Sequence, residues 1–352
     1  MKAKNILAIL ALAGALTACS SNTNTDTKET SQEANTQEMS SDEAKEKGQE
    51  ENVIYTSFFP IYNLTKQIAG DKFTVKSFTN LKTESHGFEP SAKEIAELSS
   101  AKLMFTNGAG MEEWEDAVKN AVDIELVNTS EGLDLIKASE DGHHHDEDGH
   151  HHDEDHHHHD EDHDHGHEDA EHDHHHHHGE FDPHTWLDPV NGKAQAKVIA
   201  DKLSEIDPAN KDYYQANYEK IASELDEIVA EYKDKFKDIE NRKFIVPHQA
   251  FGYLAREFDL EQIPLNSLTS TGEAASKVLK EVSDLAKAEK IKTVFYEMGG
   301  SDKAAKTLAD EIGAEAKPIN TLEFATDEEL DSNKTYQEMI KENLEAIYQS
   351  MS

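Results

Sequence analysis

The feature that most constrains the fold is an alternation, from residue 52 onward, of short apolar segments with amphipathic helical patterns. The apolar segments predict strands at 53–58, 73–78, 103–107, 124–127, 244–247 and 293–297. Between them lie helical repeats such as Ala305, Leu308, Ala309 and Ile312, which are spaced i, i+3, i+4, i+7. Such alternation is typical of an α/β fold in which parallel sheets are covered by helices.

One helical pattern is much longer than the others. After the dipeptide at 207–208, apolar residues recur every three or four positions from Tyr214 to Phe236. A helix of about 30 residues is about 45 Å long, which exceeds the needs of a small domain. We therefore expect two α/β lobes, each with a parallel sheet covered by helices, with a long rigid helix joining them. The expected boundaries are 52–206 for the N-terminal lobe, 207–241 for the linking helix and 242–352 for the C-terminal lobe.

The N-terminus has the pattern of an export signal. Lys2 and Lys4 precede an apolar run at 6–12, and small residues lead into "LTAC" at 16–19. The run is too short to span a membrane as a mature helix. Cys19 is the single cysteine of the chain, and its position resembles the lipobox of bacterial lipoproteins. The alternative is an ordinary secretory signal with an incidental cysteine.

The lipobox resemblance implies a signal peptide at 1–18, lipidation of Cys19, and an extracytoplasmic protein anchored to the bacterial cell membrane. Residues 19–51 are rich in Ser, Thr, Asn, Gln and Glu and have hardly any apolar side chains. Such a segment cannot bury enough surface to fold, so we expect a disordered tether.

Charge and histidine content point to a cation as the ligand. The chain has 73 Asp and Glu against 34 Lys and Arg, a formal net charge of -39, and 22 histidines. This acidic excess argues against binding of nucleic acid, because phosphates require a basic surface. Of the histidines, 19 lie in residues 143–178 together with 14 Asp or Glu. Ala170 is the only apolar residue in this histidine-rich tract, which we place in a loop at 141–180 and expect to be unfolded.

Imidazoles and carboxylates in such a loop can bind borderline metals weakly and at many points. The weak metal-collecting residues that we expect are His143, His144, His145, His150, His151, His152, His156, His157, His158, His159, His174, His175, His176, His177 and His178. The alternative is a spacer without a metal role. The tract does not contain the H-E-x-x-H signature of zinc proteases, because in "HEDAEH" at 167–172 the second histidine comes five residues after the first.

Three histidines lie outside the tract, and their positions favour a binding site. His86 lies downstream of the strand expected at 73–78, His248 follows the strand at 244–247, and Glu297 ends the strand at 293–297. In parallel α/β sheets, ligands bind at the carboxyl ends of strands. His184 precedes a helical pattern that starts near residue 190, and Asp182 and Asp188 are available to accept a hydrogen bond from its imidazole.

The segments around these residues resemble a known family. They are "HGFEP" (86–90), "HTWLDP" (184–189), "PHQAFGYLA" (247–255) and "VFYE" (294–297). In this order they are similar to the ligand segments of the cluster A-I substrate-binding lipoproteins of ABC metal importers, and especially to the high-affinity zinc uptake branch. The resemblance covers about residues 52–348. It implies a metal site made by His86, His184, His248 and Glu297 in a cleft between two lobes.

Three imidazoles and one carboxylate suit Zn²⁺ in a tetrahedral site, whereas Mn²⁺ prefers more oxygen ligands. The resemblance thus implies a zinc receptor that delivers Zn²⁺, as transported ligand, to the transmembrane subunit of an ABC permease. We expect it to be a monomer and not an enzyme. Alternatives are a Mn²⁺ or Ni²⁺ receptor of the same family, a surface metal store or adhesin, and a hydrolase in which Glu297 is a general base.

Overall fold

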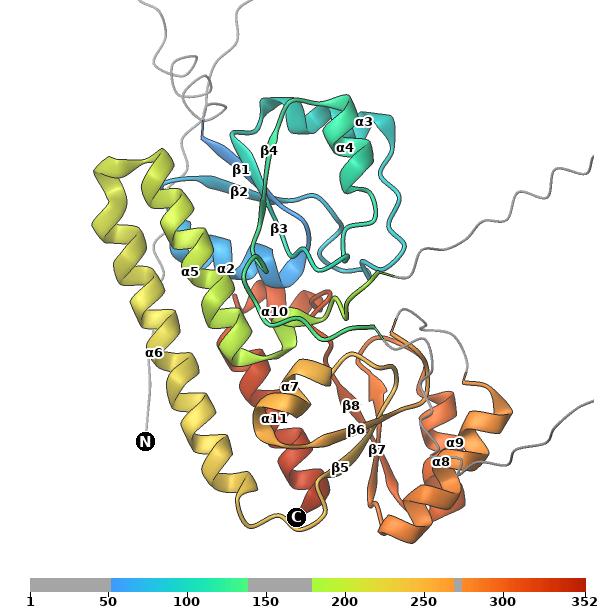
Figure 1. The fold of residues 1–352 in the computed structure, drawn as a ribbon. Helices are drawn as coiled ribbons and strands as arrows, with labels where there is room; N and C mark the ends of the chain where they lie inside the picture. The colour runs from blue at the N-terminus through green and yellow to red at the C-terminus, as the bar shows by residue number, and fades with distance from the viewer. Residues whose placement is uncertain (1–51, 139–178, 269–273) are drawn as a thin grey trace, which may run out of the picture.

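The computed structural model describes residues 52–138, 179–268 and 274–352, and it contains two four-stranded parallel sheets (Figure 1). The expected signal peptide, Cys19, the expected tether and the histidine-rich tract therefore lie outside the described residues. Within the described part of the chain, no helix is long and apolar enough to cross a membrane.

The N-terminal sheet has the strand order β2-β1-β3-β4. Its strands are β1 (Val53–Thr56), β2 (Thr74–Ser77), β3 (Leu103–Thr106) and β4 (Glu125–Asn128). The helices that connect them are α2 (Phe59–Ala69), α3 (Ala92–Glu97) and α4 (Glu115–Ala121). Each neighbouring pair of strands is parallel, as the alternation of strands and helices predicts.

Helices cover both faces of this sheet. Successive side chains of a strand point to opposite faces, so each central strand contributes to an apolar cluster on either side. Ile54 and Phe105 are fully buried in the large apolar cluster that includes α2. Their neighbours Tyr55 and Met104 face the other way, into a smaller cluster with Trp114 next to α4. The central strands are therefore apolar on both faces, which explains why they were recognisable in the sequence.

The C-terminal sheet has the strand order β6-β5-β7-β8. Its strands are β5 (Lys243–Val246), β6 (Glu261–Pro264), β7 (Thr293–Glu297) and β8 (Glu315–Ile319). The helices of this half are α7 (Gly252–Phe258), α8 (Ser276–Glu289), α9 (Lys303–Ile312), α10 (Asp327–Asp331) and α11 (Tyr336–Met351). The strands β6 and β8 are not among those that the sequence pattern predicts. Both are edge strands that contain a proline, Pro264 and Pro318, and only at an edge can a strand tolerate a residue without an N–H.

The long helix α6 spans Lys211–Phe236, 26 residues, and is slightly shorter than expected because its first turn, Pro208–Asn210, is a 3₁₀ helix. It packs along α5 (Pro189–Ile206), as Figure 1 shows, and its far end contacts α7 and α11. Its buried side chains, Tyr214, Ile221, Leu225, Ile228, Tyr232 and Phe236, are those of the sequence pattern.

A single large apolar cluster connects the two halves of the molecule. It contains Leu64 of α2, Leu225 of α6, Phe244 of β5 and Leu344 of α11, all at most 1% exposed. The C-terminal helix α11 contacts α2 as well as β5. The lobe boundaries at 206/207 and 241/242 stay a prediction, and the shared core shows that the two sheets are held together by more than the linking helix.

Candidate metal site

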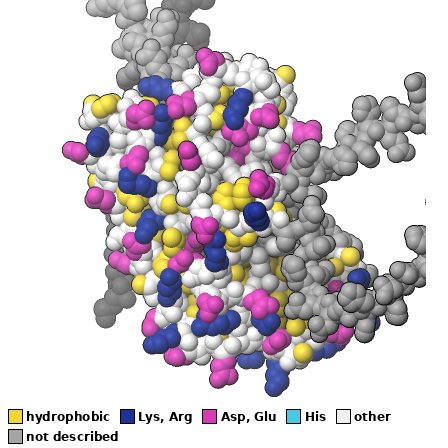
Figure 2. Space-filling model, viewed as in Figure 1, with side chains coloured by type: hydrophobic (Ala, Val, Ile, Leu, Met, Phe, Trp, Pro, Cys, Tyr) yellow, Lys and Arg dark blue, Asp and Glu magenta, His cyan; other side chains and the backbone are white. Residues whose placement is uncertain are grey.

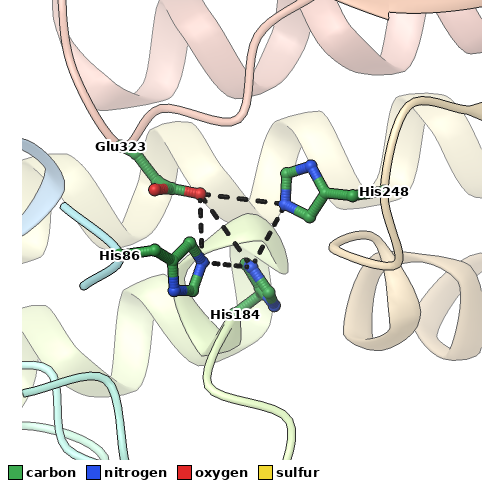
Figure 3. A group of neighbouring side chains, drawn as sticks. All are labelled: His86, His184, His248 and Glu323. Atoms are coloured by element: carbon green, nitrogen blue, oxygen red, sulfur yellow. Dashed lines mark hydrogen bonds and ion pairs between the residues drawn. The ribbon is translucent and has the colours of Figure 1, made fainter. Parts of the chain in front are cut away.

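Four side chains from loops of both halves of the molecule point toward one another in one group (Figure 3). His86 lies in the loop after β2, and His184 lies at the start of the short 3₁₀ helix Thr185–Leu187 that precedes α5. His248 follows β5, and Glu323 lies in the loop after β8. One ligand atom from each lies within 4.8 Å of the corresponding atoms of the other three.

The separations of these atoms fit a tetrahedral ion. The Nε2 atom of His184 lies 3.1 Å from Nε2 of His86 and 3.4 Å from Nε2 of His248. The Oε1 atom of Glu323 lies 3.4, 3.9 and 3.8 Å from Nε2 of His86, His184 and His248. Ligand bonds of 2.0–2.2 Å around Zn²⁺ place neighbouring donor atoms about 3.3–3.6 Å apart. The distances between these donor atoms are thus close to those of a zinc-loaded site.

The burial of the four side chains supports a metal-binding site. The side chains of His184 and Glu323 are 0% exposed, that of His248 is 1% exposed, and that of His86 is 10% exposed. Neither carboxylate oxygen of Glu323 has a hydrogen-bond partner among the described residues. A buried carboxylate without partners is costly, and a cation between it and the three imidazoles removes that cost.

The sequence-based expectation named Glu297 for the fourth position, but the structure brings Glu323 there instead. Glu297 ends β7, and its Oε2 lies 3.5 Å from Nδ1 of His248, on the side of the ring that faces away from the group. Its Oε1 accepts a hydrogen bond of 2.7 Å from the hydroxyl of Thr321. Glu297 is therefore placed to contact the ring of His248, and it is not one of the four members of the group. Glu323 was missed because it follows β8, which the sequence analysis did not recognise.

A second carboxylate supports His184. Oδ1 of Asp182 lies 2.8 Å from Nδ1 of His184 and accepts a hydrogen bond of 3.0 Å from its backbone N–H. With the proton on Nδ1, the lone pair of Nε2 points at the group. Asp188, the other acceptor that the sequence suggested, instead caps α5 by accepting from the N–H of Val190. Of the two aspartates, only Asp182 contacts the imidazole of His184.

Burial and the neighbouring charges keep the imidazole of His184 available to bind a cation. Burial, followed by the charges of His86 and His248, places the pKa of His184 well below its ordinary value. Burial lowers the pKa of His86, but the carboxylates of Glu323, Glu84 and Glu297 together outweigh that effect, so the pKa of His86 lies above its ordinary value. Burial raises the pKa of Asp182 to about 7 and is opposed by the hydrogen bond from His184. Neutral His184 can thus bind a cation without first losing a proton.

A cavity of about 750 Å³ adjoins the group and is lined by His248, Glu297 and Glu84 among others. Burial, together with the nearby charges of Glu323 and Glu297, raises the pKa of Glu84 to about 7. The polar lining next to His248 is acidic, which suits an approaching cation.

The described segments that flank the histidine-rich tract in sequence pair with each other close to His184. Lys137 and Phe181 form an antiparallel bridge, and the N–H of Ala138 donates to the carbonyl of Glu180 at 3.0 Å. Asp182, which contacts His184, donates its own N–H to the carbonyl of Ile136 at 2.8 Å. The described residues on either side of the tract are thus paired with each other close to His184.

Two lobes with parallel sheets, joined by a long helix and enclosing three imidazoles and a carboxylate, define a two-lobed metal-binding protein. This donor set suits Zn²⁺. The family model for the periplasmic zinc-uptake complex component A matches residues 54–350, and this chain belongs to that family.

Individual relatives agree with this assignment. The chain is 35% identical over 311 residues to the high-affinity zinc uptake system protein ZnuA of Bacillus subtilis, which covers 88% of this chain and 90% of the relative. It is similar to the solved structure of the metal-dependent lipoprotein YcdH of B. subtilis, with a TM-score of 0.68, 31% identity and coverage of 86% and 100%. The laminin-binding protein Lmb of Streptococcus agalactiae, described as having adhesin and metal transporting activity, has a TM-score of 0.69, 28% identity and the same coverage.

Proposed function

We propose that this protein is an extracytoplasmic receptor that captures Zn²⁺ and delivers it to the transmembrane subunit of an ABC permease. The observation that carries the proposal is the buried fourfold group, in which the carboxylate of Glu323 has no partner among the described residues other than the three imidazoles around it. Membership of the zinc-uptake family and similarity to a zinc uptake protein of B. subtilis support it.

We assign the ligands as Nε2 of His86, His184 and His248 and a carboxylate oxygen of Glu323. Glu297 then stands beside Nδ1 of His248, at 3.5 Å, while Asp182 accepts a hydrogen bond from Nδ1 of His184. Three nitrogen donors favour Zn²⁺ over Mn²⁺, which prefers oxygen ligands, while Ni²⁺ and Cu²⁺ are competitors that imidazole nitrogens also bind well.

The same geometry supports transport over catalysis. A catalytic zinc keeps one coordination position open for water, whereas four protein donors surround the centre of this group. The named adhesin activity of the S. agalactiae relative makes surface adhesion a second candidate function for this chain, one that does not require the buried group.

The test of the zinc assignment is metal content and affinity of the soluble mature protein after dialysis. We expect one tightly bound Zn²⁺ that survives dialysis and competition with a chelator. His248→Ala should weaken that affinity severely, because it removes a buried ligand and leaves the cation underbound. Glu89→Ala, at an exposed position three residues from His86, is the matched control and should leave the affinity unchanged. Equal zinc affinity of His248→Ala and wild type would reject the assignment.

We further propose that Cys19 carries a lipid that holds the receptor at the membrane, with residues 19–51 as tether and a monomer as the functional unit. The B. subtilis relative of known structure is described as a lipoprotein, which supports this. Cys19→Ser should release the protein into the medium or leave it unprocessed, as fractionation with an antibody would show. Membrane retention equal to that of the wild type would contradict lipidation at this residue.

A further inference from the structure

The loop that carries Glu323 is tied to the other half of the molecule on both sides of that residue. On one side, the indole Nε1–H of Trp186 donates to the carbonyl of Thr321 at 2.8 Å. On the other side, the N–H of Ala325 donates to the carbonyl of Leu81, in the segment that leads to His86, at 2.8 Å. Glu323 therefore projects from a short bridge whose two ends are attached to the N-terminal lobe.

The backbone of this bridge is strained next to Glu323. Leu322 has a φ of 58°, in the left-handed region that a branched side chain rarely adopts, and its side chain is fully buried. Its N–H donates to Oδ1 of Asn320 at 2.7 Å. A strained conformation of this kind persists only when its surroundings hold it in place. The attachments of Thr321 and Ala325 on either side provide that restraint.

Trp186 connects the bridge to the other ligands as well. It is two residues from His184, is 0% exposed, and its ring centroid lies 5.2 Å from that of His184. Thr321, which accepts the indole hydrogen bond, donates its hydroxyl to Glu297, the carboxylate beside His248. The indole N–H of Trp186 thus contacts the segment that positions both Glu323 and Glu297.

We propose that Trp186 is a positioning residue whose indole hydrogen bond to Thr321 holds Glu323 against the cation and so sets the rate at which Zn²⁺ dissociates. Without that bond the carbonyl of Thr321 is buried and unpaired, and the strain at Leu322 favours movement of the bridge away from the imidazoles. The rate of association changes little, because a cation reaches the group from the adjoining cavity, whose lining does not include Trp186. This inference rests on the proposed zinc site.

The test compares Trp186→Phe with Trp114→Phe. Trp114 is the only other tryptophan of the chain, is also buried, and packs against Phe78 in the separate cluster next to α4. Both changes remove an indole from a core, but only the first removes the bond to Thr321. We expect Zn²⁺ dissociation, measured by stopped flow with excess chelator, to become about tenfold faster in Trp186→Phe, the effect of one buried hydrogen bond. Association rates should stay within about twofold of the wild type in both variants.

A folded Trp186→Phe protein, with a dissociation rate equal to that of Trp114→Phe, would overturn the inference. A second measurement does not depend on the folding of Trp186→Phe. In Trp114→Phe, Trp186 is the only indole, so its ¹⁵N-labelled N–H can be followed without overlap. We expect its hydrogen exchange to be at least about tenfold slower with Zn²⁺ than without it; equal exchange would also overturn the inference. Absence of tight zinc binding by the wild type would instead reject the proposed function itself.

Discussion

Oδ1 of Asp182 lies 2.8 Å from Nδ1 of His184, while the same oxygen accepts the backbone N–H of that histidine at 3.0 Å. One carboxylate oxygen therefore fixes both the tautomer of the imidazole and the local backbone. The neighbouring Nε2 is left as a lone-pair donor in the centre of the fourfold group.

Asp182→Asn should weaken zinc binding by about 10- to 100-fold, because an amide is a poorer acceptor for the imidazole N–H and no longer increases the basicity of Nε2. Competition with a zinc chelator measures the change. Asp188→Asn is the matched control, since Asp188 caps α5 and asparagine is an equally good helix cap. The same loss of affinity in both variants would show that Asp182 acts through loop stability alone.

Glu323→Gln and Glu297→Gln should differ in the size of their effect. Loss of the Glu323 carboxylate removes a ligand, so we expect zinc affinity to fall by more than about 100-fold. Loss of the Glu297 carboxylate removes only the partner of His248 Nδ1, and we expect a fall of about 10-fold. Isothermal titration with a competing chelator distinguishes the two. The opposite order would restore Glu297 as the fourth ligand.

Deletion of residues 143–178 should leave the tight zinc site intact and abolish additional weak sites. The fold can accommodate this deletion because the backbones of Ala138 and Glu180 are already hydrogen-bonded, so a short turn can connect them. Zinc titration at about pH 7.5, where imidazoles with a pKa near 6.5 are mostly neutral, counts the sites. Growth should slow only when zinc is scarce.

A tract of equal length in which every histidine is replaced by serine is the control for this deletion. It keeps the spacing and the acidic residues but removes the imidazoles. Full support of zinc-limited growth by the serine tract, with an unchanged number of bound ions, would show that the tract is a spacer and not a collector.

Glu345→Gln should lower stability at neutral pH and have no effect near pH 2. Glu345 of α11 accepts hydrogen bonds from Lys235 at 2.8 Å and Tyr232 at 2.9 Å, both on the linking helix. The hydrogen bond from Lys235 is the main cause that lowers the pKa of Glu345 to about 2. An acid with a lowered pKa stabilises the fold above its unfolded pKa of about 4.3, and that stability is lost as the pH falls toward 2.

The expected loss from Glu345→Gln is only about 0.5 kcal/mol, because the pair is partly exposed and water screens it. Urea unfolding of the apo protein at pH 7 and at lower pH measures the difference between the two proteins. A difference that persists unchanged down to pH 2 would mean that the carboxylate charge is not its cause.

The central strands and the long helix could be predicted because the apolar pattern of their own residues reflects their burial. Val53 to Thr56 of β1 and Leu103 to Thr106 of β3 are buried along their whole length, which requires continuous apolar segments. Tyr214 to Phe236 repeat with the period of a helix because one face of α6 is buried. The edge strands β6 and β8 could not be recognised, since half-exposed strands with a proline lack that pattern.

The sequence by itself determined the parallel α/β architecture, the separate character of the histidine-rich tract, and the three histidines outside it that meet in one place. These features depend on local composition and on which strand a residue follows. Tertiary structure alone decided the carboxylate of the group. Glu297 ends one strand of the C-terminal sheet and Glu323 follows another, and only the path of the bridge from Thr321 to Ala325 brings Glu323 to the imidazoles. That path is held by Trp186 and Leu81, residues far away in the sequence, so no local pattern near Glu323 could have revealed it.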